Sequence, residues 1–292
     1  MSNQLQGPTT VPTVQMISIA KLGQLEQFER FHSSTYQFPT RVVRAIGGSK
    51  AHFSKAITLQ NLAKRLAPNI DLDEAQMETQ GFSPSANAHE ICTVFEASIL
   101  ELYASLDCAW QVFVEAFSKA RGMPTDSTRK LFLKLQDGKH FGAPFPSELG
   151  TLIADAHWYP RLLHLRDTLT HSDTGSLHKD QETGLLRYMH TSIKSEGKPL
   201  FIEDAFVWFK ELLNDLNTFL GNAFRIMNLT LGETRVHQIC GFVDGRILMR
   251  EISYLEEIEN TGGICMSKVW FEEPQNPTCP FKSTCPTFNK NA

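Results

Sequence analysis

The chain has 292 residues, which is enough for about two domains of average size. Apolar residues make up 41% of it and charged residues 21%, which are the proportions of a folded protein and exclude a collagen-like or largely disordered chain. A formal net charge of -4 argues against a surface covered with phosphate-binding side chains, although the charge is unevenly distributed.

Two basic stretches and one acidic stretch stand out. Six basic residues and no acidic ones lie between Arg41 and Arg65, and six more lie between Lys119 and Lys139 against two aspartates. Residues 251–273 instead carry six glutamates against one lysine. Either basic stretch can contact an anion, and either is equally compatible with a solvated helix face.

The chain has no signal for export or membrane insertion. No apolar run approaches the ~18 residues of a membrane span, and the N-terminus lacks the basic and apolar regions of a signal peptide. The six cysteines are too few and too irregularly spaced to staple a fold of this size. We therefore expect a cytoplasmic protein with reduced thiols, no membrane contact and no cofactor.

The first 84 residues divide into a leader and a helical block. Residues 1–15 are polar and aperiodic, and we expect a disordered leader there. Residues 16–84 have mostly helical spacing, interrupted at residues 37–40 and at Gly47-Gly48, and then reach an acidic linker at 71–81. This block is expected to form an N-terminal helical appendage and linker.

Residues 85–230 have the pattern of a four-helix core. After Ser85, apolar side chains recur at steps of three and four for some seven turns, and a stripe of that length requires helical partners. A short helix capped by Asp126 or Ser127 should follow. Further helices are expected at about 147–170, with a kink or restart at Pro160, and at about 203–227.

Two segments favour β-structure. Residues 184–202 contain two apolar runs around a turn, which predicts a hairpin inserted into the bundle. After Gly232, two apolar runs flank Asp244-Gly245, a typical hairpin turn, and residues 263–271 are a third candidate strand. We therefore expect a mainly α protein with a small β-rich C-terminal module at 231–292.

The candidate catalytic residues are Arg166, Asp167 and His171, at the end of the third core helix. An Arg followed by a His at such a distance occurs roughly once by chance in a chain of this composition, so context must support it. On a continuing helix the two side chains would point about 140° apart. We expect the helix to end near His171, so that the ring turns back towards Arg166.

A guanidinium beside an imidazole suits RNA cleavage without a metal. That reaction needs a base for the 2′-hydroxyl, a proton for the leaving 5′-oxygen and positive charge for the phosphorane oxygens. A two-fold dimer would supply both groups twice across one cleft. Glu96, Glu101 and Asp107 on the long helix are candidates to hold Arg166 or His171 in place.

At these residues the chain resembles the HEPN superfamily, helical-bundle proteins marked by Arg-x4-6-His, usually with Asn, Asp or His after the Arg. The resemblance covers residues 85–230. It implies a homodimeric, metal-independent endoribonuclease, often in toxin–antitoxin or antiviral defence systems, with an inhibitory or antitoxin partner. Arg166 and His171 would then be catalytic, and Asp167 would support them.

An alternative is a catalytically inactive helical module that binds a nucleotide or acts through a partner protein, with Arg166 buried or ion-paired.

The C-terminal cysteines have the ligand type for zinc, but Cys279 and Cys285 are farther apart than the ligands of a standard zinc knuckle. We expect ordinary buried thiols rather than a metal site. The candidate ligands would be Cys240, Cys265, Cys279 and Cys285.

Overall fold

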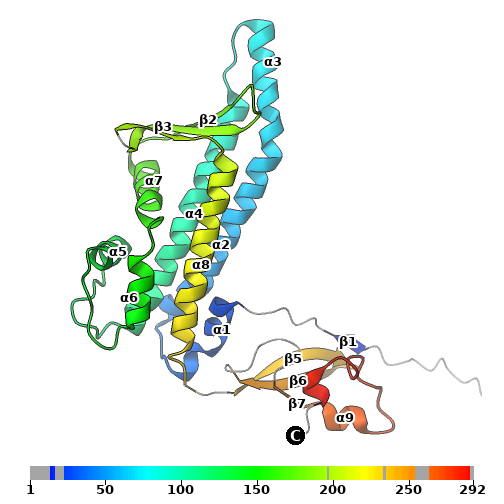
Figure 1. Cartoon of the computed structure of the whole chain (residues 1–292). Coiled ribbons are helices and arrows are strands. Elements are labelled where there is room, and N and C mark those ends of the chain that lie inside the picture. Colours follow the sequence, from blue (N-terminus) through cyan, green and yellow to red (C-terminus); the bar gives the residue numbers. More distant parts are fainter. Residues whose placement is uncertain (1–13, 17–22, 196, 233–234, 254–262, 290–292) are drawn as a thin grey trace, which may run out of the picture. The chain divides into compact units, whose positions relative to one another are not determined.

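The computed structural model describes residues 14–16, 23–195, 197–232, 235–253 and 263–289. The chain is mostly helical and has two small antiparallel sheets, which confirms the expected mainly α class (Figure 1). It divides into two compact units. We call residues 36–229 the bundle unit, and the described residues of 1–35 and 230–292 the terminal unit.

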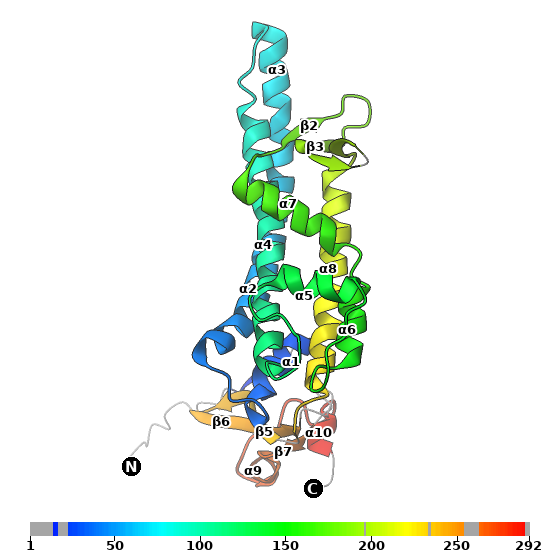
Figure 2. The same ribbon diagram turned by 90° about the vertical axis from the view of Figure 1, so that its left-hand side faces the viewer.

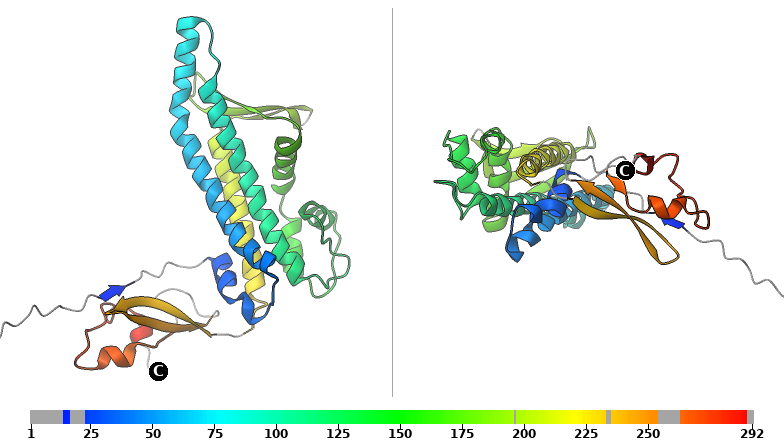
Figure 3. Two further views of the ribbon diagram at one scale, coloured as in Figure 1. Left: turned by 180° about the vertical axis from the view of Figure 1, so that it is seen from behind. Right: turned by 90° about the horizontal axis from the view of Figure 1, so that it is seen from below.

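The bundle unit contains seven α-helices within its described residues, and its longest helices run side by side (Figures 1 and 3). They are α2 (Thr40–Leu66), α3 (Ile70–Gln80), α4 (Ala86–Ala116), α5 (Thr128–Gln136), α6 (Ser147–Ala154), α7 (Tyr159–His171) and α8 (Ala205–Asn228), with a 3-10 turn at Ala67–Asn69. The apolar stripe predicted along α4 is confirmed as core. All its members are buried: Ile91, Phe95, Ile99, Leu102, Leu106, Ala109, Phe113 and Phe117.

Of the block expected as an N-terminal appendage at 16–84, residues from 36 on are part of the bundle unit, because α2 packs along α4. Its buried face is formed largely of small residues, among them Ala45, Ser49, Ala56 and Ala63. Helix α2 also passes unbroken through Gly47-Gly48. A Cβ at Gly48 would lie 3.1 Å from the Cys108 sulfur, so this glycine permits close helix packing rather than ending the helix.

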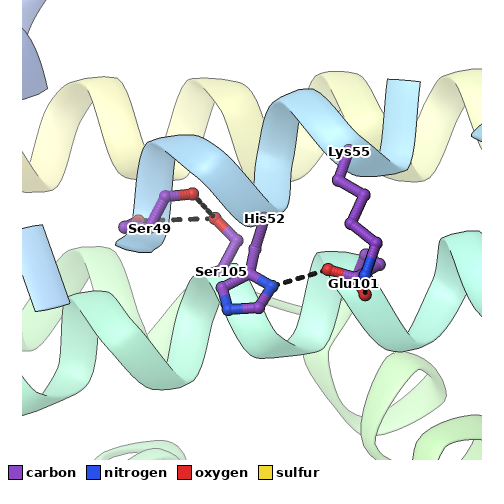
Figure 4. A network of polar contacts seen from close by, with 5 residues as sticks. All are labelled: Ser49, His52, Lys55, Glu101 and Ser105. Carbon is purple, nitrogen blue, oxygen red and sulfur yellow. Dashed lines mark hydrogen bonds and ion pairs between the residues drawn. The ribbon is translucent and has the colours of Figure 1, made fainter. Parts of the chain in front are cut away.

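Polar contacts fix the alignment of α2 on α4 (Figure 4). His52 Nδ1 lies 2.6 Å from Glu101 Oε2, and Lys55 donates to the other oxygen of the same carboxylate. The Ser105 hydroxyl donates to the Ser49 carbonyl oxygen at 2.7 Å. That hydroxyl proton is therefore committed to the backbone, and we interpret the cluster as a tie between helices rather than a catalytic triad.

The acidic segment expected as a linker is helix α3. Its Asp73 accepts hydrogen bonds from the backbone N–H groups of Asn87 and Ala88, at 3.4 and 2.9 Å. These N–H groups belong to the first turn of α4, where a carboxylate is favoured by the helix dipole and by unpaired donors. The acidic residue is therefore used to cap the next helix.

The helices around the predicted motif begin and end as expected. Ser127 caps α5 by accepting from the Lys130 N–H at 3.3 Å, which confirms one of its two predicted caps. The predicted break near Pro160 is also confirmed, because α6 ends at Ala154 and α7 restarts at Tyr159 with the proline in its first turn.

The inserted hairpin predicted within residues 184–202 is present and has one more strand than expected. Strands β3 (Leu186–Ser195) and β4 (Lys198–Ile202) pair antiparallel, and β2 (Ser176–Lys179) adds to the other side of β3. Strand β2 begins five residues after His171, so this sheet continues directly from the predicted motif.

The terminal unit holds a four-stranded antiparallel sheet in the order β1-β5-β6-β7 (Figure 1). Figure 2 shows β5, β6 and β7 with α9 and α10. Its described elements are β1 (Val14–Met16), α1 (Gln24–Phe31), a 3-10 turn at His32–Ser34, β5 (Arg235–Val243), β6 (Arg246–Ser253), β7 (Ile264–Cys265), α9 (Lys268–Glu272) and α10 (Pro286–Asn289). The hairpin turn at Asp244-Gly245 is confirmed, and both of its residues have positive φ.

Two expectations for this unit were wrong. The third candidate strand at 263–271 is only two residues long, because the chain enters α9 at Lys268. The leader expected at 1–15 includes part of β1, which pairs with β5, while residues 1–13 lie outside the described part of the chain. Among the helices that are described, none combines the length and apolar character needed to cross a membrane.

Candidate functional site

Arg166 lines a polar surface pocket of about 370 Å³ formed by α4, α5 and α7. Helix α4 supplies Tyr103 and Asp107, and the start of α5 supplies Thr128 and Arg129. Two of the predicted site residues, Arg166 and Asp167, come from α7 and lie in this pocket together. The third, His171, is not among the residues that line it.

The Arg166 guanidinium is held by two kinds of contact. Its Nη1 donates to Asp167 Oδ1 at 2.8 Å, and its central carbon lies 4.8 Å from the centre of the Tyr103 ring. The hydrogen bond to Asp167 is the main cause of a raised pKa for Arg166. A third of the side chain is still exposed. The group is therefore charged, oriented and partly open to a ligand.

Asp167 lies between two arginines. Its Oδ1 accepts from Arg166, and its Oδ2 is 3.5 Å from Arg129 Nη1. The side chains of Arg129, Arg166 and Asp167 are each about a third exposed or more. Solvent therefore screens both ion pairs, and each contributes little energy. Their effect is geometric, since the carboxylate aligns two guanidinium groups on one side of the pocket.

Asp107 is the acidic residue of α4 that accompanies Arg166. Burial raises the pKa of its carboxyl, while a 2.6 Å hydrogen bond from Thr128 and the charge of Arg166 oppose that rise. The other two candidates on this helix serve elsewhere: Glu101 binds His52 and Lys55, and Glu96 lies beneath the segment after α7. Two arginines and three carboxylates therefore line the pocket, since Asp126 is also part of its wall.

The expectation that the His171 ring turns back towards Arg166 was wrong. Helical hydrogen bonding continues through this residue, since the N–H groups of Ser172 and Asp173 both donate to the Thr168 carbonyl, at 2.9 and 3.1 Å. His171 is the last residue of α7 and is exposed. A step of five residues on a helix separates it from Arg166 by about 140°, so one chain does not bring the two side chains together.

The segment after His171 is anchored by a buried carboxylate. Glu96 Oε1 accepts from the Gly175 N–H at 2.6 Å and from the Tyr188 hydroxyl at 2.8 Å. A Cβ at Gly175 would collide with the Tyr188 ring, so glycine is required for this close approach. The connection between α7 and β2 is therefore held in a defined position next to the motif.

Sequence reasoning missed Tyr103, Thr128 and Arg129 as members of this site. Arg129 belongs to the basic stretch from Lys119 to Lys139, which was a usable signal for anion contact. Tyr103 and Asp107 are one turn apart on α4, and both line the pocket. Only the fold shows that these side chains meet Arg166.

Comparison with known proteins provides no relative from which roles could be transferred. The chain matches no family model, and neither a curated protein nor a solved structure is similar enough to it to indicate a relationship. The assignment of a function therefore depends on the residues of the site.

Proposed function

We propose that the protein is a HEPN-type, metal-independent endoribonuclease that acts in the cytoplasm as a toxin or defence effector. The observation that carries the proposal is the state of Arg166: it is charged, aligned by Asp167 and Tyr103, and partly exposed in a polar pocket. Such a guanidinium can bind two non-bridging oxygens of a phosphodiester. The Arg-x4-His motif and the helical bundle around it agree with this assignment.

A second copy of the chain is part of the proposal, because Arg166 and His171 lie on different faces of α7 in one chain. In a two-fold dimer, Arg166 of one copy would hold the phosphate while His171 of the other takes the proton of the 2′-hydroxyl. The 2′-oxygen then bonds to phosphorus, and the 5′-oxygen leaves with a proton from solvent, to which the imidazolium of His171 returns its own. The products are a 2′,3′-cyclic phosphate and a 5′-hydroxyl.

The test is cleavage of a synthetic RNA in the presence of EDTA, with analysis of the product ends. We expect cleavage to continue and to leave 2′,3′-cyclic phosphates. The matched control is the same oligonucleotide with 2′-deoxyribose at the cleaved position, which should resist cleavage because the nucleophile is absent. Cleavage of the control, or ends bearing 5′-phosphates, would contradict the proposed chemistry.

The ion pair between Arg166 and Asp167 favours one other function. In a catalytically inactive module, the two arginines and Asp167 would hold α7 on α5, and the pocket would bind a nucleotide or a partner protein. Replacement of Arg166 by alanine would then lower the melting temperature. If the protein is a nuclease, the same replacement would remove cleavage with little effect on stability. An inhibitory or antitoxin protein would then be expected to cover the site.

A further inference from the structure

Four cysteines from distant parts of the sequence gather in the terminal unit. Cys279 is part of a small buried cluster with Leu248, Phe271 and Phe288. The other three, Cys240, Cys265 and Cys285, pack against the same cluster.

The four cysteines lie on separate elements of the terminal unit. Cys240 is the unpaired residue of a β-bulge in β5, since the register with β6 shifts between Ile239 and Gly241. Bulges redirect a side chain out of the regular alternation of a strand. Cys265 ends β7, while Cys279 and Cys285 flank the turn before α10. The convergence is therefore produced by three parts of the unit and not by one local motif.

The four sulfurs influence one another electrostatically. Burial is the main cause that raises the pKa of Cys240 to about 11, and the thiols of Cys265, Cys285 and Cys279 raise it further. Cys265 is in turn affected by Cys279 and Cys285, and Cys279 by Cys285. These mutual effects agree with the packing of all four cysteines at one buried cluster.

Backbone donors already point at two of the sulfurs. The N–H groups of Ser267 and Lys268 donate to the sulfur of Cys265, two and three residues ahead of it. The N–H of Phe281 donates to Cys279 in the same way. Burial raises the pKa of both thiols, and these hydrogen bonds oppose that rise because they favour the thiolate, the form that binds a metal.

The buried cluster around these cysteines is small, with only four buried members among the described residues. Modules with little apolar core usually need a disulfide or a metal to be stable. A metal bound by the four cysteines would supply such a staple.

We propose that Cys240, Cys265, Cys279 and Cys285 bind one structural zinc ion as four thiolates. Zinc prefers four-coordinate sulfur sites of this kind. Binding releases four protons to solvent and leaves a site of net charge -2, and the nearby Arg250 supplies positive charge beside Cys240. Among the described side chains, no three candidate ligands already stand in a coordinating arrangement, so the thiols must close around the ion.

The first measurement is the metal content of the full-length protein, expressed with zinc in the medium and purified under reducing conditions. We expect about one zinc per chain. Each of the variants Cys240→Ser, Cys265→Ser, Cys279→Ser and Cys285→Ser should lose it. The bundle-unit variants Cys92→Ser and Cys108→Ser are the matched controls and should retain it, since both of these cysteines lie on α4.

A second measurement remains informative if the serine variants fold poorly. Cobalt added to the metal-free wild-type chain should give the thiolate-to-metal charge-transfer bands and strong d–d bands of a tetrahedral sulfur site. A folded chain with neither zinc nor a cobalt spectrum would overturn the proposal. So would iron in place of zinc, equal zinc loss in the Cys92→Ser control, or disulfides among these four thiols in the freshly purified protein.

Discussion

The guanidinium of Arg166 lies over the ring of Tyr103, 4.8 Å from its centre, while one of its nitrogens donates to Asp167. Stacking and hydrogen bonding together fix both the position and the plane of the group. An ammonium ion could keep the charge and the ion pair but not the plane. The role of Arg166 can therefore be tested by a substitution that preserves its charge.

We expect Arg166→Lys to reduce RNA cleavage by roughly 10²-fold or more, because a point charge does not reproduce a planar group that binds two oxygens. The melting temperature should change little. The matched control is Arg161→Lys, since Arg161 is on the same helix and also lies over an aromatic ring, that of Trp208 at 4.6 Å. Equal losses of cleavage in both variants would show that cleavage depends on stacked arginines of α7 in general and not on the pocket around Arg166.

His171 should be indispensable for cleavage and dispensable for folding. It is exposed at the last position of α7, where a side chain contributes little packing. His171→Ala should therefore lower the rate by roughly 10²- to 10⁴-fold, the usual contribution of a positioned acid or base, at an unchanged melting temperature. His164→Ala, another exposed histidine of α7, is the control. Full cleavage by a folded His171→Ala chain would end the catalytic assignment.

Mixing two inactive variants tests whether the site is shared between copies. Light scattering at micromolar concentration should show a dimer. In a mixed dimer of Arg166→Ala and His171→Ala chains, one Arg166 still faces one His171 across the cleft, so part of the activity should return. No recovery after verified subunit exchange, or a monomeric active enzyme, would contradict the shared site.

The periodicity of α4 could be predicted from the sequence because its large apolar side chains mark one face without ambiguity. The same reasoning failed for α2, whose buried face consists largely of alanines and a serine and which passes through Gly47-Gly48. Small residues give little hydrophobic signal, yet they are what allows two helices to approach closely. Helix packing of this kind is a tertiary property that a local pattern does not contain.

The candidate site was predictable only in part for a similar reason. Arg166 and Asp167 are adjacent in sequence and form their ion pair locally. Tyr103 and Arg129 reach the pocket through the packing of α4 and α5 against α7, which no spacing along the chain encodes. The turn-forming residues after Thr170 correctly predicted a helix end near His171. The direction of the His171 ring was not predictable from them, because the Thr168 carbonyl accepts from both Ser172 and Asp173 and keeps His171 in the helix.

The tie between α2 and α4 should make part of the stability dependent on pH. Burial tends to raise the pKa of Glu101, but hydrogen bonds from His52 and Lys55, and their charges, lower it below its ordinary value of 4.5. A lowered folded-state pKa stabilises the fold above pH 4.5, and this contribution is lost as the pH falls through the folded-state value.

Replacement of Glu101 by glutamine should therefore cost about 1 kcal/mol at pH 7, a modest loss because His52 and Lys55 are substantially exposed. The difference from the wild-type chain should shrink as the pH falls below 4.5. Denaturant unfolding at several pH values measures it. Glu90→Gln, at an exposed position of the same helix, should show neither effect. A pH-independent difference would mean that the carboxylate acts through packing alone.

The segment that follows His171 should be sensitive to a single methyl group. A Cβ at Gly175 would collide with the ring of Tyr188, and the hydroxyl of Tyr188 donates to the buried carboxylate of Glu96. Gly175→Ala should destabilise the protein by roughly 1–3 kcal/mol, as overpacking usually does. It should also reduce cleavage, because the connection beside the motif must shift. Gly142→Ala is the control, since a Cβ there meets no atom within 4 Å.

The cause can be isolated with a double variant. If the collision with Tyr188 is responsible, the penalty of Gly175→Ala should shrink markedly in a Tyr188→Ala background, because the ring that the new methyl group meets is gone. Thermal unfolding of the four chains of this cycle gives the coupling directly. Additive penalties would show that Gly175 is required for its backbone and not for its distance from Tyr188, and the segment after His171 would then owe its position to the hydrogen bond with Glu96.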